Sequence, residues 1–320
     1  MKKIGVLTSG GDAPSMNACL RAITMMADHL GFEVFGVLDG YQGLIDGKYK
    51  KLTIEDVENI LPLGGTIIRT SRCDEFRTEK GIQKAVKNVK KAGFDCVIVL
   101  GGDGSFHGAQ ELTKKGVNTI CIPATVDNDL KYTDSTLGFS TAVDSIMDAV
   151  LKIRETCESH ERVCFVEVMG RNSGELALAG GVASGAEVII VPENKTNLTE
   201  IVAKINKSII RGGKSVIGIV AEGVGKAEDF AKLIKEKTGV DAKSVNLSYI
   251  QRGGSPTAYD RVLATKMGAE AVRLADSGNY NCAIGIKNGS IITVELEKVF
   301  TSKRNKFDFE LLKTNDILSV

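Results

Sequence analysis

Two aspartates flank an asparagine at residues 125–129, which read TVDND. The segment follows the apolar run ICIP, so an acidic loop is expected to leave a buried strand. Asp and Asn favour turns because their side chains bond the local backbone, and a solvated turn is one explanation. The other explanation is phosphoryl transfer to an alcohol, which needs a base on the hydroxyl and a metal on the phosphates. Two carboxylates one residue apart, Asp127 and Asp129, could divide those roles.

Two glycine-rich segments also follow apolar runs, TSGGD at 8–12 and GGDGS at 101–105. Glycines let backbone N–H groups close on a phosphate, and the N-terminus of a following helix adds partial positive charge. Asp103 could hold Mg²⁺, which prefers one or two carboxylates together with phosphate oxygens. Each segment taken alone also fits a tight turn without a ligand. The Walker pattern GxxxxGK[ST] does not occur in the sequence.

Three arginines lie near strand ends in loops of small residues: Arg162, Arg171 and Arg252. Guanidinium groups match phosphate oxygens bidentately, although each residue taken singly fits an ordinary surface arginine. Glu222 also follows a strand, where a solvated loop acid is the alternative. We interpret His107 and His160 as a helix-start residue and a loop residue, because an acid already serves as the base.

The elements that must position these residues follow from hydrophobic patterning. Apolar runs without strict alternation predict strands covered on both faces, at 4–8, 34–38, 96–100, 119–123, 163–168, 187–191 and 215–221. Residues 16–27 and 141–158 carry apolar positions at i, i+3 and i+4, which predicts packing helices. Alternating strands and helices favour a parallel α/β sheet, where ligands bind at the carboxyl ends of the strands. From about Thr301 the chain is charged and weakly patterned, and no element is predicted there.

Composition limits the class of protein. The chain has 320 residues, 43% hydrophobic and 25% charged, which are ordinary globular values, and this length favours two domains or one large one. Its formal net charge of +1 argues against a nucleic-acid partner and an anionic membrane surface. The 7 cysteines form no CxxC and several lie in apolar runs, so we expect reduced, mostly buried thiols in a cytoplasmic protein. No apolar stretch approaches the ~20 residues that span a bilayer, and the polar break at 9–12 argues against a signal peptide.

Taken together and in order, TSGGDAPSMNA, GGDGS, PATVDND, EVMGR and QRGGSP resemble the motifs of the ATP-dependent phosphofructokinase family, from Lys3 to about Gly289. The resemblance implies an α/β fold of two Rossmann-like domains, with mostly parallel sheets, helices on both faces and the active site in the inter-domain cleft. It implies an ATP-binding domain at 1–138 plus about 251–300, and a sugar-phosphate-binding domain at 139–250 plus about 301–320. It also implies a cytoplasmic, allosteric homotetramer whose active sites are completed by a neighbouring subunit.

The resemblance further implies transfer of the γ-phosphoryl group of Mg-ATP to the 1-hydroxyl of fructose 6-phosphate in glycolysis. Asp127 would be the base, Thr125, Arg72 and Arg171 would assist the transfer, and Asp103 and Asp129 would bear on Mg²⁺. The residues implied for ATP are Gly11, Tyr41, Arg72, Cys73, Arg77, Gly102, Asp103, Gly104, Ser105 and Gly108. Those implied for the sugar phosphate are Thr125, Asp127, Met169, Gly170, Arg171, Glu222, Tyr249 and Arg252, with Arg162 and Lys243 reaching from a neighbouring subunit. An effector site for ADP or phosphoenolpyruvate would use Arg21, Arg154, Glu187, Arg211 and Lys214.

Two positions bear on the phosphoryl donor. Relatives that use pyrophosphate usually carry GGDD and a lysine before the threonine of TxDND. Here Gly104 leaves room for the α-phosphate and adenosine, and Ala124 stands in place of that lysine. Both favour ATP, although Ala124 itself departs from the usual glycine.

Other departures bear on substrate and regulation. Tyr249 stands where the family has a histidine that contacts the sugar phosphate, and Lys243 replaces an arginine, which loses the bidentate fork. We therefore expect weaker binding of fructose 6-phosphate or a different phosphosugar. Ser15 replaces a glycine and Cys73 a common aromatic residue. Basic residues are usual in the effector site at the positions of Met25, Ile54 and Gly213, so we expect weak regulation.

Alternative functions stay open at this point. One is a kinase of the same fold with another acceptor, such as tagatose 6-phosphate, or another donor. A second is a catalytically weakened regulatory subunit, against which the intact set of Arg72, Asp103, Asp127, Asp129 and Arg171 argues. An NAD or lipid kinase also carries GGDG, but such kinases lack the TxDND and QRGGSP elements.

Overall fold

The computed structural model describes residues 2–195, 197–301 and 307–319 of the chain. The chain divides into two compact units. The first consists of the described residues within Met1–Thr125, Leu130–Ser140 and Arg252–Asn305. The second consists of those within Val126–Asp129, Thr141–Gln251 and Lys306–Val320. Part of the stretch after Thr301, for which the sequence predicted no element, falls at 302–306 and 320 and lies outside the described residues.

The described part of the first unit contains a seven-stranded sheet. In spatial order its strands are β11 (Ser290–Glu295), β10 (Cys282–Lys287), β5 (Thr119–Pro123), β4 (Cys96–Gly101), β1 (Lys3–Thr8), β2 (Glu33–Val37) and β3 (Tyr49–Leu52). The strands from β10 to β2 run parallel, while β11 and β3 pair antiparallel at the two edges. The central strands β4 and β5 are buried throughout, as expected where helices cover both faces of a sheet.

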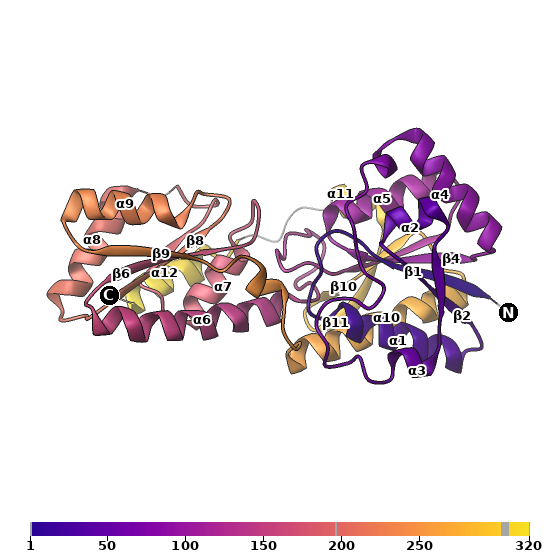
Figure 1. Cartoon of the computed structure of the whole chain (residues 1–320), viewed down its shortest axis with the longest axis horizontal. Helices are drawn as coiled ribbons and strands as arrows, with labels where there is room; N and C mark the ends of the chain where they lie inside the picture. Colours follow the sequence, from indigo (N-terminus) through magenta and orange to yellow (C-terminus); the bar gives the residue numbers. More distant parts are fainter. Residues whose placement is uncertain (1, 196, 302–306, 320) are drawn as a thin grey trace. The chain divides into compact units, whose positions relative to one another are not determined.

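Helices cover both faces of this sheet (Figure 1). On one face lie α1 (Met16–His29), α3 (Ile54–Val57) and α10 (Ala258–Ser277). On the other lie α2 (Tyr41–Asp46), α4 (Glu79–Ala92), α5 (Asp103–Lys114), α11 (Leu296–Thr301) and the 3-10 turn η1 (Glu75–Arg77). Ile98 and Val99 are neighbours on β4 and belong to the two opposite cores, because successive strand residues point to opposite faces.

The second unit is built on a parallel sheet of four strands in its described part. The order is β7 (Val188–Ile190), β8 (Val216–Ala221), β6 (Val163–Val168) and β9 (Ala242–Asn246), followed by the 3-10 turn η2 (Ser248–Arg252). The helices α8 (Leu198–Ile210) and α9 (Ala227–Thr238) pack on one face (Figure 1). The other helices are α6 (Phe139–Ser159), α7 (Glu175–Ala183) and α12 (Phe309–Leu318), which packs beside α7.

The predicted α/β class is confirmed, and each predicted strand and helix corresponds to an observed one. The seven cysteines are free, and six of them are buried, as expected. Burial raises the pKa of Cys164 to about 12 and that of Cys282 to about 11, so neither thiol ionises near neutral pH. Among the helices that the structure describes, none is long and apolar enough to cross a membrane.

Candidate active site

The acidic loop after β5 contains a buried carboxylate with a cationic partner. Asp127 is 5% exposed, and Arg171 Nε lies 3.2 Å from its Oδ2. Asn128, between the two aspartates, has φ 47°, a left-handed conformation that asparagine tolerates well. A carboxylate removed from water is stabilised by a nearby positive charge. Arg171 supplies that charge, and its side chain remains 61% exposed.

The loop after β6 brings Arg171 to this carboxylate. Gly170 has φ 134° and Arg171 has φ 51°, so the chain turns sharply here. Glu222 Oε1 accepts a hydrogen bond from Arg171 N at 2.8 Å, and Gln251 Oε1 accepts one from Met169 N at 3.0 Å. The strand ladder does not satisfy these backbone donors, so side chains from two other segments do. The loop is therefore held on both sides of Gly170.

Arg162 and Lys243 meet at one carboxylate of the second unit. Arg162 Nε lies 2.5 Å from Asp241 Oδ2, and Lys243 Nζ lies 3.3 Å from Oδ1. Desolvation acts to raise the pKa of Asp241, but the hydrogen bond from Lys243 and the two positive charges outweigh it and lower the pKa. β6 and β9 are adjacent, which brings the two cations together. Tyr249 lies on η2 and is 75% exposed.

In the first unit, the first turn of α5 presents glycines and one carboxylate. A Cβ on Gly104 would meet no atom within 4 Å, whereas a Cβ on Gly101 would lie 2.4 Å from Ser105 Oγ. The connection from β4 to α5 is thus open at Gly104 and closed at Gly101. Open space at the positive end of a helix suits an anion such as phosphate. The exposed Asp103 begins the helix, and its Oδ2 lies 3.6 Å from His107 Nε2.

This carboxylate suits a magnesium ion that is held mainly by nucleotide phosphates. Mg²⁺ usually takes one or two protein carboxylates and completes its shell with phosphate oxygens and water. Within the described ranges, no group of three or more His, Cys, Asp or Glu residues could hold a metal ion by itself. Asp103 fits a site in which nucleotide phosphates supply most of the ligands. Within those ranges there is no site made by protein side chains alone.

Tyr41 lies inside the first unit, between two of the segments expected to hold ATP. Its ring stacks on Phe76 of η1 with centroids 4.1 Å apart, and its hydroxyl donates to Ser105 O at 2.6 Å. A Cβ on Gly108 would lie 2.7 Å from the Tyr41 ring. Burial raises the pKa of Tyr41 well above its usual range. The structure therefore packs Tyr41 against α5 and η1.

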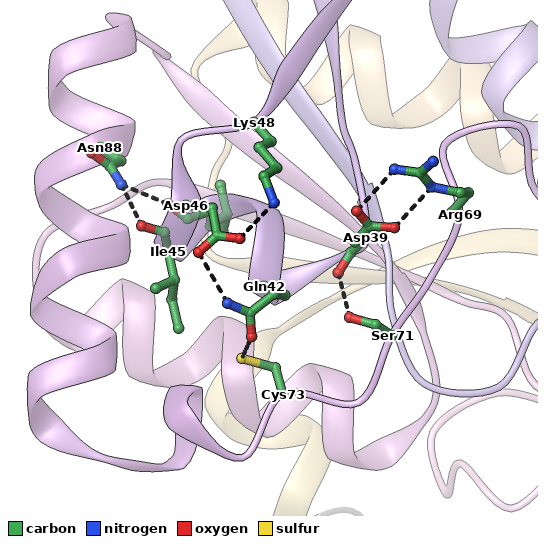
Figure 2. A network of polar contacts seen from close by, with 10 residues as sticks. Asp39, Gln42, Ile45, Asp46, Lys48, Arg69, Ser71, Cys73 and Asn88 are labelled. Carbon is green, nitrogen blue, oxygen red and sulfur yellow. Dashed lines mark hydrogen bonds and ion pairs between the residues drawn. The ribbon is translucent and has the colours of Figure 1, made fainter.

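The loop that carries Arg72 is anchored on both sides of that residue (Figure 2). Ser71 Oγ donates to Asp39 O at 2.9 Å, and the Asp39 carboxylate makes two bonds to Arg69, at 2.8 and 2.9 Å. Cys73 Sγ contacts Gln42 Oε1 at 3.2 Å. Arg72 itself is exposed, and so is Arg77, the last residue of η1.

Gly11 packs directly against Arg252. A Cβ at this position would lie 2.9 Å from the guanidinium carbon of Arg252. Any larger residue would push that side chain away. The glycine of TSGGD thus makes room for an arginine of QRGGSP.

The motifs described above lie within a region that matches one protein family. Residues 3–275 match the family model described as Phosphofructokinase. The chain belongs to the phosphofructokinase family.

Full-length relatives support this membership. The ATP-dependent 6-phosphofructokinase of Clostridium botulinum is 49% identical over 319 residues, and that of Alkaliphilus metalliredigens is 47% identical over 320 residues. Each alignment covers 100% of both chains. A phosphofructokinase structure from Saccharomyces cerevisiae has a TM-score of 0.91 at 34% identity and covers 98% of this chain. The chain spans 50% of the length of that yeast chain.

The residues that the phosphofructokinase resemblance assigned to an effector site are distributed over both units. Arg154 makes bonds of 2.7 and 3.3 Å to Glu187 and a third, of 2.7 Å, to Gly185 O. Glu187 Oε2 also accepts from Ile217 N at 2.7 Å. Arg211 and Lys214 are exposed near the end of α8, and Arg21 lies on α1 of the first unit. The structure thus brings together Arg154 and Glu187, which neutralise each other.

Several residues that contact the predicted site residues or their loops were not singled out from the sequence. They are Asp39, Gln42, Arg69, Asp241 and Gln251. Gln251 stands inside the QRGGSP motif, which was its only signal. The others make contacts between segments that are far apart in the chain, and no local sequence pattern predicts such contacts.

Proposed function

We propose that this phosphofructokinase-family chain is an ATP-dependent 6-phosphofructokinase. It transfers the γ-phosphoryl group of ATP to the 1-hydroxyl of fructose 6-phosphate, giving fructose 1,6-bisphosphate in glycolysis. Two full-length relatives carry this name, at 49% and 47% identity. The observation that carries the chemistry is the buried Asp127 carboxylate with the Arg171 guanidinium 3.2 Å away.

Asp127 is the base in this proposal. It takes the proton of the 1-hydroxyl as that oxygen forms its bond to the γ-phosphorus. The bond from phosphorus to the bridging oxygen of ADP breaks, and ADP leaves with the electron pair. Before the reaction Arg171 lies beside the carboxylate as its counter-charge. Once Asp127 is protonated, its attraction for Arg171 falls, and the guanidinium can then stabilise charge on the transferring group.

The nucleotide binds to the first unit, which is the ATP-binding domain of this proposal. The open first turn of α5 receives phosphates at Gly102, Gly104 and Ser105, and Arg72 and Arg77 add positive charge. Asp103, together with Asp129 of the acidic loop, would hold Mg²⁺. Bound there, the ion would neutralise charge that develops on the phosphate oxygens.

The sugar phosphate binds to the second unit. Met169, Gly170, Arg171 and Glu222 face the sugar in this proposal, while Arg162 and Lys243 reach the 6-phosphate bound to a neighbouring subunit. Both cations lie beside Asp241, where the Lys243 side chain is 52% exposed and the Arg162 side chain 34%, which supports that role. A homotetramer in the cytoplasm, as in the family, follows from the same proposal.

Initial rates with Mg-ATP and fructose 6-phosphate test this function. Asp127→Asn keeps the shape and removes the base, so kcat should fall about 100- to 10,000-fold. Tagatose 6-phosphate and sedoheptulose 7-phosphate serve as competing acceptors, since Tyr249 replaces the histidine of the family. Poor turnover of fructose 6-phosphate with efficient use of another acceptor would refute the proposed substrate. A fully active Asp127→Asn variant would refute the proposed base.

A further inference from the structure

Gln251 is a polar side chain with no exposed surface, at 0%. Its Nε2 donates to Ser248 O at 3.1 Å, and its Oε1 accepts from Met169 N at 3.0 Å. The orientation of the amide is unambiguous, because a backbone N–H only donates and a carbonyl only accepts. A buried amide is costly unless it is hydrogen-bonded, so the two bonds hold this side chain in a single orientation.

The bond from Met169 N replaces the next backbone hydrogen bond of a strand pairing. β6 and β9 are parallel neighbours, and their last backbone bond runs from Leu247 N to Glu167 O at 3.1 Å. The next bond of a parallel ladder would run from Met169 N to Leu247 O. Leu247 O instead accepts from Ile250 N at 3.1 Å, which begins η2. Gln251 Oε1 takes over as the acceptor for Met169 N.

The joined segments both carry residues proposed for the sugar phosphate. Met169 begins the loop of Gly170 and Arg171, while η2 carries the exposed Tyr249. Glu222 fixes that loop at Arg171 N. Without Gln251 the loop would keep that anchor and lose the one at Met169.

We propose that Gln251 is a positioning residue for the sugar phosphate. It acts through Met169 and Ser248, and it sets the spacing between the loop after β6 and η2. This inference rests on the proposed function, since it concerns the acceptor side of that reaction. It predicts a selective defect: the KM for fructose 6-phosphate changes, while the KM for ATP does not.

A pair of substitutions separates positioning from mere packing. Gln251→Met has a similar length and makes neither bond, so the KM for fructose 6-phosphate should rise about tenfold at every pH. Gln251→Glu keeps the acceptor for Met169 N but, when ionised, turns a second oxygen toward the carbonyl of Ser248. When protonated, its hydroxyl donates to that carbonyl and restores the pattern of glutamine. Burial raises the pKa of such a carboxyl toward neutrality, so lowering the pH should rescue this variant.

The measurement is the KM of each variant divided by that of the unchanged protein, from about pH 8 to about pH 6, the range across which a carboxyl with such a raised pKa would titrate. The ratio for Gln251→Glu should fall toward one as the pH falls, and that for Gln251→Met should stay constant. Gln83→Met, at an exposed position of α4, is the matched control and should leave both KM values unchanged. Equal changes in both KM values, or no rescue at low pH, would overturn the inference. If Gln251→Met does not fold, the pH series of Gln251→Glu decides alone.

Hydrogen exchange makes the test independent of substrate. Peptides containing Met169 should exchange faster in Gln251→Met than in the Gln83→Met control. Unchanged exchange there would overturn the proposed anchor. If the unchanged protein does not phosphorylate fructose 6-phosphate, the proposed function fails, while the exchange experiment still decides whether Gln251 holds this loop.

Discussion

At the scale of single residues, Tyr249 and Lys243 are the positions most expected to tune sugar-phosphate binding. Lys243 Nζ is 3.3 Å from Asp241, beside Arg162, where an arginine could add a second parallel bond to a phosphate. Tyr249 is 75% exposed, so histidine can replace it without leaving a cavity. We expect Tyr249→His combined with Lys243→Arg to lower the KM for fructose 6-phosphate about tenfold, the effect of one charge-assisted hydrogen bond.

Steady-state kinetics at fixed Mg-ATP would measure this change. Tyr259→His, at another exposed tyrosine, is the control and should leave the KM unchanged. An unaltered KM in the double variant would mean that the departures at 243 and 249 do not limit binding. A gain with tagatose 6-phosphate alone would mean that the pocket is built for that sugar.

At the scale of elements, Tyr41 connects α2, η1 and α5. Its hydroxyl bonds Ser105 O in the first turn of α5, and its ring stacks on Phe76, between Arg72 and Arg77. Tyr41→Phe removes only the hydroxyl, which should lower the free energy of unfolding by about 1 kcal/mol. It should also raise the KM for ATP, because the phosphate-binding turn loses one of its supports.

Tyr132→Phe is the matched control for that change. Tyr132 is also buried in the first unit, and its hydroxyl donates to Ile284 O at 2.7 Å. Urea unfolding should show a similar loss of stability in both variants, while only Tyr41→Phe should affect the KM for ATP. Equal KM values for ATP in the two variants would limit Tyr41 to a packing role.

The elements also show how far sequence patterns reach. The strands β1, β4, β5, β6 and β8 were predicted because they are long apolar runs buried on both faces. β9 reads AKSVN and is mostly exposed at a sheet edge, so its composition carries no strand signal. β10 reads CAIGIK and is buried except at Lys287; its Gly285 packs against a distant side chain, since a Cβ there would lie 2.8 Å from the Tyr132 ring. Position at a sheet edge and packing against a distant residue depend on tertiary structure, so a local sequence pattern does not predict them.

In the candidate site, too, local patterns predicted some features and missed others. Asp127, Arg171 and Glu222 were expected in the site because each lies in a loop after a predicted strand. The contact of Glu222 with the backbone of Arg171, and the bond of Gln251 to Met169, depend on how two loops approach each other. Residue type and strand order therefore indicated the charged groups, but not the hydrogen bonds that orient them.

At the scale of the whole molecule, the effector residues indicate weak regulation. Glu187 is 9% exposed, and its carboxylate is occupied by Arg154 and Ile217 N. An arginine that is already paired with a carboxylate gives little attraction to an anion from outside. Met25, Ile54 and Gly213 supply no compensating charge. We expect hyperbolic saturation by fructose 6-phosphate, with ADP or phosphoenolpyruvate shifting half-saturation less than about twofold.

Ile54→Arg probes this expectation, because Ile54 is 39% exposed, so a charged side chain at this position can reach solvent. Added charge at this position should increase the response to either effector. Gly213→Lys is unsuitable, since a Cβ there would lie 2.9 Å from Ser208 O. Strongly sigmoidal kinetics of the unchanged protein, relieved by ADP, would contradict the prediction.

The assembly of subunits can be tested most directly through Arg162, because this residue is proposed to serve the active site of a neighbouring subunit. Asp127→Asn and Arg162→Ala should each abolish most of the activity. When the two variants are unfolded, mixed in equal amounts and refolded, about a quarter of the sites should combine an intact Asp127 with an intact Arg162 from a different subunit. Activity should therefore reappear in the mixture, to about that fraction.

If both residues served the same site within one subunit, every site would lack one of them, and mixing would restore nothing. Refolding each variant alone gives the baseline, and the recovered activity decides between the two arrangements without any structure of the assembly.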